Sequence, residues 1–407
     1  MQQTKAGLRR RLTLPLLVLY GVGITIGAGI YVLIGSVAAH AGAQAPLAFI
    51  FAGAVMAFTV GSYAELCGRY PVSAGEAAYV KAAFRSRGLS TFTGLLTLLV
   101  GIVSSAAVAV GSAGYIQQFV AIPTPVIVSL VVILLSIVAA WGILESVLLA
   151  SIFTIIEVGG LLAVIAAATF HEVPVGAALL TLPTDGPLPW MGIAFGSLLA
   201  FFAFVGFEDL ANVVEEAKNP NRDMPWAMAI TLGLATALYV WIAAIAVAVV
   251  PLQQLAESSA PLTLVYRHVA GISPATISAI AIVATLNTVL ALLTMASRIL
   301  YGMAGLGDIP RIFGYVHHRT STPLIATAAV TVLALIFALL VPFERLAEWT
   351  SVATLLVFAV VNLALIRLRW REKTPSTGHV RVPLWVPVIG LLTSLGMMAA
   401  SVLPTSG

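Results

Sequence analysis

Two segments of this chain place carboxylate side chains inside long apolar runs. Glu157 lies in Ile155-Ile-Glu-Val-Gly-Gly160, and Glu208 and Asp209 follow directly after Phe201-Phe-Ala-Phe-Val-Gly-Phe207. If these runs cross a lipid bilayer, an ionisable group at that depth costs at least about 2.5–3.5 kcal/mol. Such a group is tolerated where it faces a cavity, forms a pair or satisfies freed backbone groups. The carboxylates are therefore candidates for ion or proton chemistry inside a membrane.

Each carboxylate has a functional and a purely structural interpretation. Glu157 is either a coupling-ion or proton site, or a protonated acid that bonds to loosened backbone and never changes charge. Glu208 and Asp209 are neighbours, so on a helix their side chains point about 100° apart and cannot share one site. We expect Glu208 to face the cavity, and Asp209 to form a pair or a cap, with Arg298 as a candidate partner.

Other polar side chains in apolar runs are weaker candidates. Thr285, Asn287 and Thr288 lie together in one run, and Ser104 lies in another. The first three are candidates for a cation or proton site, and Ser104 for substrate contact. The alternative for all four is hydrogen bonding between packed helices.

Glycines interrupt one of the apolar runs near its middle. Gly21, Gly23, Gly27 and Gly29 fall within nine residues, and each costs a helix about 1 kcal/mol relative to alanine. Close helix packing through small residues is one explanation, and a broken helix is the other. The segment around Gly206 and Glu208 favours the break, because it lies five spans later, as expected for two inverted five-helix repeats. Broken helices present free N–H groups and free carbonyls, which suit the two ends of a zwitterionic amino acid.

The elements that must position these residues are membrane spans. The 407 residues are 60% hydrophobic and 9% charged, whereas soluble proteins carry about 25% charged residues. Apolar runs of about 20 residues match the thickness of the hydrocarbon layer. The sequence predicts eleven spans, at 13–39, 46–67, 91–120, 125–140, 146–169, 190–213, 226–250, 273–298, 323–341, 347–367 and 384–403.

The basic side chains indicate the orientation. With the amino terminus in the cytoplasm, eighteen of the twenty Lys and Arg residues fall in cytoplasmic loops, and only Arg267 and Arg345 fall outside. We therefore expect a cytoplasmic tail over 1–12 and an external carboxyl terminus. A short interfacial helix is expected between the second and third spans, and the external loop 251–272 is a candidate lid.

Composition and motifs exclude several classes. One cysteine, Cys67, precludes an intramolecular disulfide and a multi-cysteine metal site. The glycine runs match no phosphate-binding loop, so we expect no nucleotide cofactor. We expect no metal, because His317 and His318 lack Cys or carboxylate ligands at metal spacing. The net charge of +4 does not indicate a nucleic-acid partner, because the placement of the charges matters more than their sum. A membrane-embedded enzyme or a sensor is the alternative from a different class, but no histidine lies within a span and no soluble output domain is evident.

Five motifs, in this order, resemble those of the amino acid–polyamine–organocation superfamily. They are Gly23-Ile-Thr-Ile-Gly-Ala-Gly-Ile-Tyr31, Tyr70-Pro-Val-Ser-Ala-Gly-Glu-Ala-Ala-Tyr79, Phe204-Val-Gly-Phe-Glu208, Glu215-Glu-Ala-Lys-Asn-Pro-Asn-Arg-Asp-Met-Pro225, and Ser297-Arg-Ile-Leu-Tyr301 with Gly307-Asp-Ile-Pro310. The resemblance implies an all-α, leucine-transporter-like fold with five-plus-five inverted repeats, at 13–169 and 190–367, with helices 1 and 6 broken. The segment 384–403 would be an additional membrane helix.

The same resemblance implies functional residues. The backbone of Thr25, Ile26, Gly27, Ala28 and Gly29 should hold the substrate carboxylate and amino group. Phe202 is similar to a gating aromatic of the family, and Ala203 and Val205 to pocket contacts. Two features depart from the family pattern: the chain has eleven expected spans where many members have twelve, and Glu157 stands where several proton-coupled members carry a lysine.

These observations predict a secondary active transporter in the cell membrane. Its expected substrate is a neutral, apolar or small amino acid, moved by proton-coupled symport or exchange, with sodium coupling as the alternative. If Glu208 receives a second ammonium group, the substrate is instead a cationic amino acid or a polyamine. Oligomeric state and accessory subunits do not follow from the sequence.

Overall fold

The computed structural model describes residues 12–27, 29–71, 75–141, 147–180, 188–270, 275–305, 307–317, 322–372 and 378–402. The described residues form helices and no strand, apart from one isolated bridge between Leu12 and Ala217. The helices are α1 Leu14–Ile26, α2 Gly29–Ala41, η1 Gly42–Gln44, α3 Ala45–Arg69, α4 Gly75–Phe84, α5 Arg87–Ile116, α6 Thr124–Trp141, α7 Val147–Phe170, α8 Val175–Leu180, α9 Leu188–Phe202, η2 Phe207–Glu216, α10 Pro220–Val249, α11 Leu252–Glu257, α12 Pro261–Ala270, α13 Ala275–Gly305, η3 Arg311–Gly314, α14 Leu324–Leu340, α15 Phe343–Arg371 and α16 Trp385–Val402.

The helices agree with the predicted spans. Seven described stretches are long and apolar enough to cross a membrane, and four shorter helices are also apolar. One of the seven stretches, 29–69, is divided at Gly42, whose φ of +58° separates α2 from α3. Each of the eleven predicted spans coincides with one helix or with a consecutive pair. The chain is a multi-pass membrane protein.

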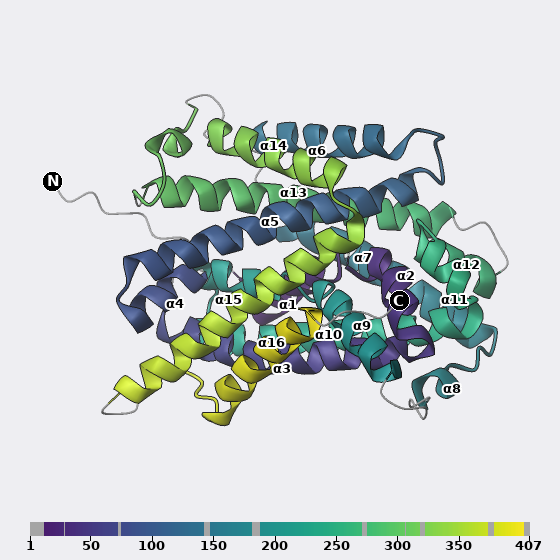
Figure 1. Ribbon diagram of the computed structural model, residues 1–407, viewed down its shortest axis with the longest axis horizontal. Coiled ribbons are helices and arrows are strands. Elements are labelled where there is room, and N and C mark those ends of the chain that lie inside the picture. Colours follow the sequence, from purple (N-terminus) through teal and green to yellow (C-terminus); the bar gives the residue numbers. More distant parts are fainter. Residues whose placement is uncertain are drawn as a thin grey trace.

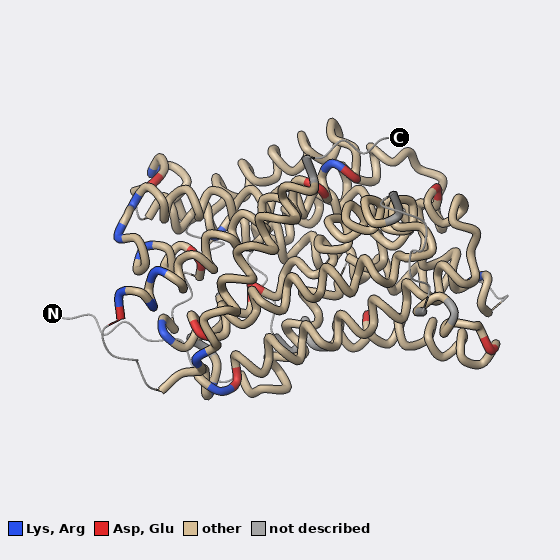
Figure 2. The backbone as a smooth tube through the Cα atoms, turned by 60° about the horizontal axis from the view of Figure 1, so that its bottom comes forward, with Lys and Arg blue, Asp and Glu red and all other residues tan. Residues whose placement is uncertain are grey.

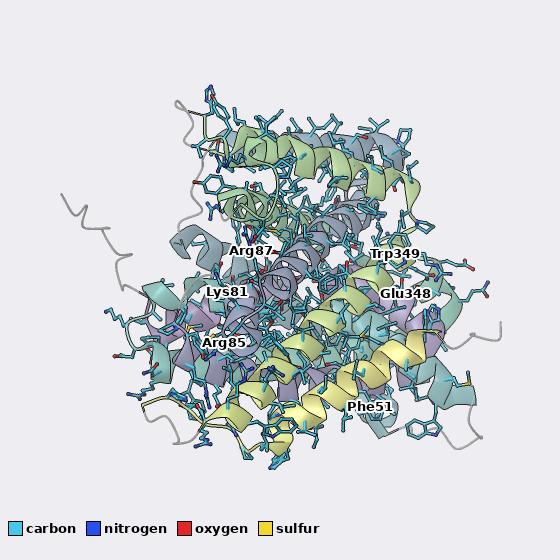
Figure 3. All side chains as sticks on the ribbon, turned by 60° about the vertical axis from the view of Figure 1, so that its left-hand side comes forward. Phe51, Lys81, Arg85, Arg87, Glu348 and Trp349 are labelled. Carbon is cyan, nitrogen blue, oxygen red and sulfur yellow. The ribbon has the colours of Figure 1, made fainter. Side chains whose placement is uncertain are left out.

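Most of the long helices run along one axis of the molecule (Figure 1). The short helix α4, which the sequence predicts, lies at one end of the bundle, and α8, α11 and α12 lie at the other. Figure 2 shows the described Lys and Arg residues concentrated at the α4 end. In Figure 3, Lys81, Arg85 and Arg87 lie on one side of the bundle and Glu348 and Trp349 on the other.

Local sequence explains where several helices begin. Proline occupies the first turn of α1, α3 and α10, where its missing N–H has no intrahelical acceptor to lose. At the start of α5, the Ser86 side chain accepts a hydrogen bond from the backbone N–H of Leu89 at 3.3 Å. Exposed tryptophans mark both ends of the bundle, among them Trp226 and Trp370 near the α4 end and Trp190 and Trp349 near the other. This distribution matches the aromatic belts of membrane proteins.

Two buried polar networks hold α15 and α16 against α3. Asn362 of α15 accepts a hydrogen bond from Ser62 at 2.6 Å and donates one to Thr59 at 3.0 Å. A methyl group on Gly390 of α16 would lie 2.7 Å from the Asn362 side-chain oxygen, so α16 packs directly on this cluster. Nearer the α4 end, Glu65 of α3 is fully buried. It accepts hydrogen bonds from Arg69 at 2.8 Å, from Arg369 at 3.0 Å and from the backbone N–H of Val382 at 2.9 Å.

Replacing Glu65 with Gln tests this charge network. The change leaves Arg69 and Arg369 around an uncharged amide, and removing one partner of a buried ion pair costs about 3–5 kcal/mol. We expect Glu65→Gln to lower the thermal unfolding midpoint of the detergent-purified protein, followed by tryptophan fluorescence. Glu257→Gln, which alters an exposed carboxylate, should unfold like the wild type. Equal midpoints for the two variants would contradict the stabilising role of Glu65.

Candidate functional site: two facing helix breaks

The first span is interrupted at its glycines. α1 ends at Ile26, where the N–H of Gly27 bonds to the Gly23 carbonyl at 3.2 Å, and α2 begins at Gly29. The same glycines also allow side chains of other helices to pack closely against the first span. A methyl group on Gly23 would lie 2.0 Å from the Thr154 hydroxyl of α7, and one on Gly27 would lie 2.2 Å from the Thr288 hydroxyl of α13. Both interpretations of the glycine run therefore hold, because the small residues allow a helix break and tight packing around it.

The sixth span is interrupted in a similar way. α9 ends at Phe202, residues 203–206 form a turn, and the chain continues as the 3₁₀ helix η2 from Phe207. Gly206 has a φ of +121°, which L side chains rarely adopt. A methyl group on Gly206 would lie 2.6 Å from the Ile24 side chain, and one on Gly29 would lie 2.4 Å from the Cα atom of Ala203. The two breaks thus touch each other.

Tyr239 of α10 joins the two breaks. Its buried hydroxyl lies 2.7 Å from the Thr25 carbonyl and 2.8 Å from the Ala203 carbonyl. Thr25 is in the last turn of α1 and Ala203 directly follows α9, so neither carbonyl has a regular helical donor. The Tyr239 ring also packs on Phe204, with centroids 5.0 Å apart. One side chain therefore serves the free backbone of both interrupted spans.

The predicted substrate residues lie at these breaks with one exception. Thr25, Ile26, Gly27, Gly29, Phe202 and Ala203 are buried, and Val205 is partly buried. The Thr25 hydroxyl has no hydrogen-bond partner among the described residues. Ala28 lies outside the described residues. Ser104 of α5 is the exception, because its hydroxyl points to Thr350 of α15 at 3.4 Å.

Glu157 lies in α7 and is fully buried. Neither of its carboxyl oxygens has a hydrogen-bond partner within the part of the chain that the structure describes. Asn287 of α13 approaches the carboxyl group without a hydrogen bond of normal geometry. The Glu157 carbonyl, by contrast, accepts a hydrogen bond from the Tyr31 hydroxyl at 2.6 Å. A buried carboxyl group without partners is costly as an anion, so this position calls for a proton or a cation.

The remaining polar candidates are satisfied locally. Thr285 donates to the Ala281 carbonyl at 2.8 Å and Thr288 donates to the Ala284 carbonyl at 3.0 Å, both within α13. Thr288 nevertheless lies against Gly27 at the first break. The Glu208 carboxylate accepts a hydrogen bond from the Gly206 N–H at 2.9 Å, so it caps the second break.

The sequence did not single out Tyr239, Tyr63 or Glu76 as residues of this region. Tyr63 of α3 donates to Glu76 of α4 at 2.9 Å, and its ring packs on Phe207 of η2 with centroids 5.5 Å apart. Burial raises the pKa of Glu76 above its ordinary value. A tyrosine in an apolar span signals that its hydroxyl has a partner. The sequence shows this need without identifying the partner.

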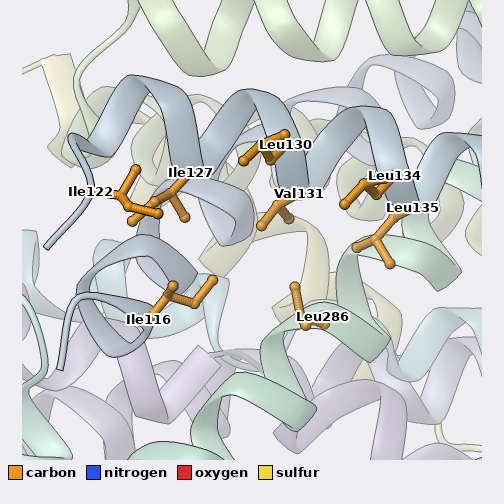
Figure 4. Close-up of a pocket in the computed structure, with 8 residues that line it drawn as sticks. All are labelled: Ile116, Ile122, Ile127, Leu130, Val131, Leu134, Leu135 and Leu286. Carbon is orange, nitrogen blue, oxygen red and sulfur yellow. The ribbon is translucent and has the colours of Figure 1, made fainter. Parts of the chain in front are cut away.

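A separate cavity of about 200 Å³ lies between α6, the end of α5 and the inner part of α13 (Figure 4). Only apolar side chains line it, namely Ile116, Ile122, Ile127, Leu130, Val131, Leu134, Leu135 and Leu286. A zwitterion would find no polar partner there.

The fold and site define a multi-pass helical membrane protein with a polar centre built from interrupted spans. The chain belongs to the amino acid permease family, whose model matches residues 12–407. This finding confirms the resemblance to the amino acid–polyamine–organocation superfamily.

Curated relatives agree with the family. The chain is 31% identical over 419 residues to "Cationic amino acid transporter 2, vacuolar" of Arabidopsis thaliana, covering 97% of this chain and 66% of that protein. It is 30% identical over 413 residues to "Branched-chain amino acid permease BcaP" of Bacillus subtilis, covering 94% of this chain and 85% of that one. It is 27% identical over 427 residues to "Methylthioribose transporter" of the same organism, covering 97% and 88%.

The chain spans 63–66% of the length of the three Arabidopsis transporters named cationic amino acid transporters 2, 3 and 4. The family model is described as amino acid permease, and these relatives carry the names of transporters or permeases.

A pair of glycine substitutions tests the contact between the breaks. Gly29→Ala places a methyl group 2.4 Å from the Ala203 Cα atom, so the two backbones must separate. Overpacking of this kind costs about 1–3 kcal/mol, and we expect a lower unfolding midpoint and weaker substrate uptake. Gly159→Ala in α7 meets open space and should match or slightly exceed wild-type stability. Wild-type behaviour of Gly29→Ala in both assays would show that the breaks do not touch.

Proposed function

We propose that this protein is a secondary active transporter that moves neutral, apolar or small amino acids by alternating access. The proposal is carried by the two facing breaks that Tyr239 joins. Breaks in the first and sixth spans suit two inverted five-helix repeats, which we assign to residues 13–169 and 190–367. Residues 1–12 are then a tail and 384–403 an additional membrane helix.

The polarity of the half-helices supports binding of a zwitterion. α1 and α9 end at the breaks, where their last carbonyls carry partial negative charge. α2 and η2 begin there, where their first N–H groups carry partial positive charge. In the proposed complex, the substrate ammonium contacts the carbonyls of Thr25 and Ala203, and the carboxylate contacts the N–H group of Gly29 at the start of α2. The free Thr25 hydroxyl is an additional donor.

Two observations favour a neutral substrate. Phe202, Ala203 and Val205 offer apolar contacts, and the Glu208 carboxylate is already bonded to the Gly206 N–H. That bond directs the carboxylate toward the backbone of the break, which favours a capping role over contact with a second ammonium group. The alternative is a cationic amino acid or a polyamine, which the names of the plant relatives favour. The name of the bacterial branched-chain permease favours the neutral class.

Coupling is assigned to protons taken up by Glu157. Its carboxyl oxygens are buried without partners, and α7 packs directly on α1 next to the first break. A protonated Glu157 avoids the cost of a buried anion, whereas release of the proton calls for a rearrangement that brings in water or a cation. Sodium at the same position, near Asn287 and Thr288, is the alternative coupling ion.

The proposed setting is the cell membrane, with the amino terminus in the cytoplasm and the carboxyl terminus outside. The concentration of Lys and Arg at the α4 end supports this orientation, because cytoplasmic loops carry an excess of these residues (Figure 2).

A ligand panel on detergent-purified protein tests the substrate class. Ligand binding stabilises the folded state by about 2.7 kcal/mol when the ligand is present at 100 times its Kd. We expect leucine or alanine to raise the unfolding midpoint, and arginine and putrescine to leave it unchanged. Because Glu208 caps the break, Glu208→Gln should weaken the response to every ligand alike. A wild-type response confined to arginine or putrescine, and lost in Glu208→Gln, would establish the cationic alternative.

The pH dependence of uptake into proteoliposomes tests the coupling residue. If Glu157 binds the coupled proton, Glu157→Gln should retain amino acid exchange but flatten the pH dependence of uptake. Glu172→Gln, which changes an exposed acid in the turn after α7, should keep the wild-type profile. An unchanged profile in Glu157→Gln, together with a sodium requirement, would refute proton coupling at this residue.

A further inference from the structure

Tyr115, near the end of α5, connects α12 to α2 by hydrogen bonds that are not part of the proposed substrate site. The side chain is fully buried. Its hydroxyl accepts a hydrogen bond from the backbone N–H of Leu262 at 3.4 Å and donates one to the carbonyl of Tyr31. Leu262 is in the first turn of α12, where helix N–H groups lack intrahelical acceptors. Tyr115 therefore satisfies the start of α12 and ties it to α2.

Tyr31 continues the chain of hydrogen bonds. Its own hydroxyl donates to the carbonyl of Glu157 in α7 at 2.6 Å. The contact is close, since a methyl group on Gly160, one turn further along α7, would lie 2.9 Å from the Tyr31 hydroxyl. Three successive hydrogen bonds thus link α12, α5, α2 and α7, and the last one reaches the backbone of the buried acid.

The segment Leu252–Ala270, which contains α11 and α12, packs into this region through its backbone; we call it the outer segment. A methyl group on Gly35 of α2 would lie 2.6 Å from the Leu255 carbonyl oxygen. One on Gly114 of α5 would lie 1.9 Å from the Ser259 carbonyl oxygen. Two glycines on neighbouring helices therefore form a slot that the outer segment fills without room for a further carbon atom.

We infer that Tyr115 and Tyr31 act as a latch that links closure of the outer segment to the position of α2 beside Glu157. The inference rests on the proposed alternating-access function. Tyr31 belongs to α2. Its carbonyl accepts a hydrogen bond from Tyr115, and its hydroxyl donates one to α7. If the outer segment moves outward and α2 shifts with it, these hydrogen bonds must break. The two tyrosines are positioning residues, since they touch the backbone of the moving elements and not the proposed substrate.

The latch makes a prediction about exposure of the outer segment. Leu255 of the outer segment is fully buried. A cysteine at this position, in a Cys67→Ala background, therefore reports opening of the outer segment. Loss of one ordinary hydrogen bond shifts an equilibrium about five-fold. Tyr115→Phe and Tyr31→Phe should each raise the rate of labelling by a membrane-impermeant maleimide by about that factor. Tyr301→Phe, which removes the hydroxyl of a side chain 40% exposed in α13, should leave the rate unchanged.

Transport kinetics separate a latch from a merely structural role. A weaker closed state raises the population open to the outside, so Tyr115→Phe should lower the external KM and also lower the maximal rate. A structural defect would lower the amount of active protein and leave KM unchanged. The double variant should show less than the sum of the two single effects, because both residues act in one chain of bonds.

The outcomes distinguish the latch from the transport function. Faster labelling in both tyrosine variants, with the expected change in KM, supports the latch. Wild-type labelling rates in both variants, in a protein that takes up amino acids, would overturn the latch and leave the proposed function intact. Failure of every amino acid to stabilise the wild type would instead remove the proposed function, whatever the labelling rates, and the inference with it.

Discussion

A backbone carbonyl that leaves a helix inside a bilayer must find another donor, because no lipid group supplies one. Two such carbonyls, of Thr25 and Ala203, meet at the single hydroxyl of Tyr239. That hydroxyl has one hydrogen, so at any moment one of the two carbonyls has an incomplete bond. The arrangement holds the two interrupted spans together and still leaves acceptor capacity for an ammonium group. Under the proposed function, stability and substrate binding depend on the same backbone atoms.

The breaks also depend on how closely their surroundings approach. Gly23, Gly27 and Gly29 each lie so near a residue of another element that a side chain would clash. Gly206 adds a backbone conformation that few other residues adopt. These glycines weaken regular helix and permit tight contact, and both effects act at the same positions. The Glu208 carboxylate then satisfies an N–H group that the second break leaves free.

Much of the fold follows from the sequence because membrane spans have a simple physical signature. The length of the apolar runs predicted the spans. The glycines at 21–29 and the segment around Gly206 predicted where two of these spans are interrupted. The sequence did not predict the hydrogen-bond partners of the buried tyrosines. Tyr239, Tyr31 and Tyr115 stand in apolar runs whose periodicity does not reveal which distant carbonyl each hydroxyl meets. Ser104 shows the same limit, since its hydroxyl points to Thr350 of a span far along the chain. The Glu208 carboxylate caps the backbone of the second break, and its expected orientation toward a cavity stays a prediction.

Direct observation of the occupied site tests this account most sharply. A density map of the purified protein, determined with a saturating neutral amino acid, should show the ligand against the free backbone groups of the two breaks. Its ammonium group should lie within hydrogen-bond distance of the Thr25 or Ala203 carbonyl, and its carboxylate near the start of α2. Continuous helices through residues 25–29 and 202–207, or a ligand bound away from both, would contradict the account.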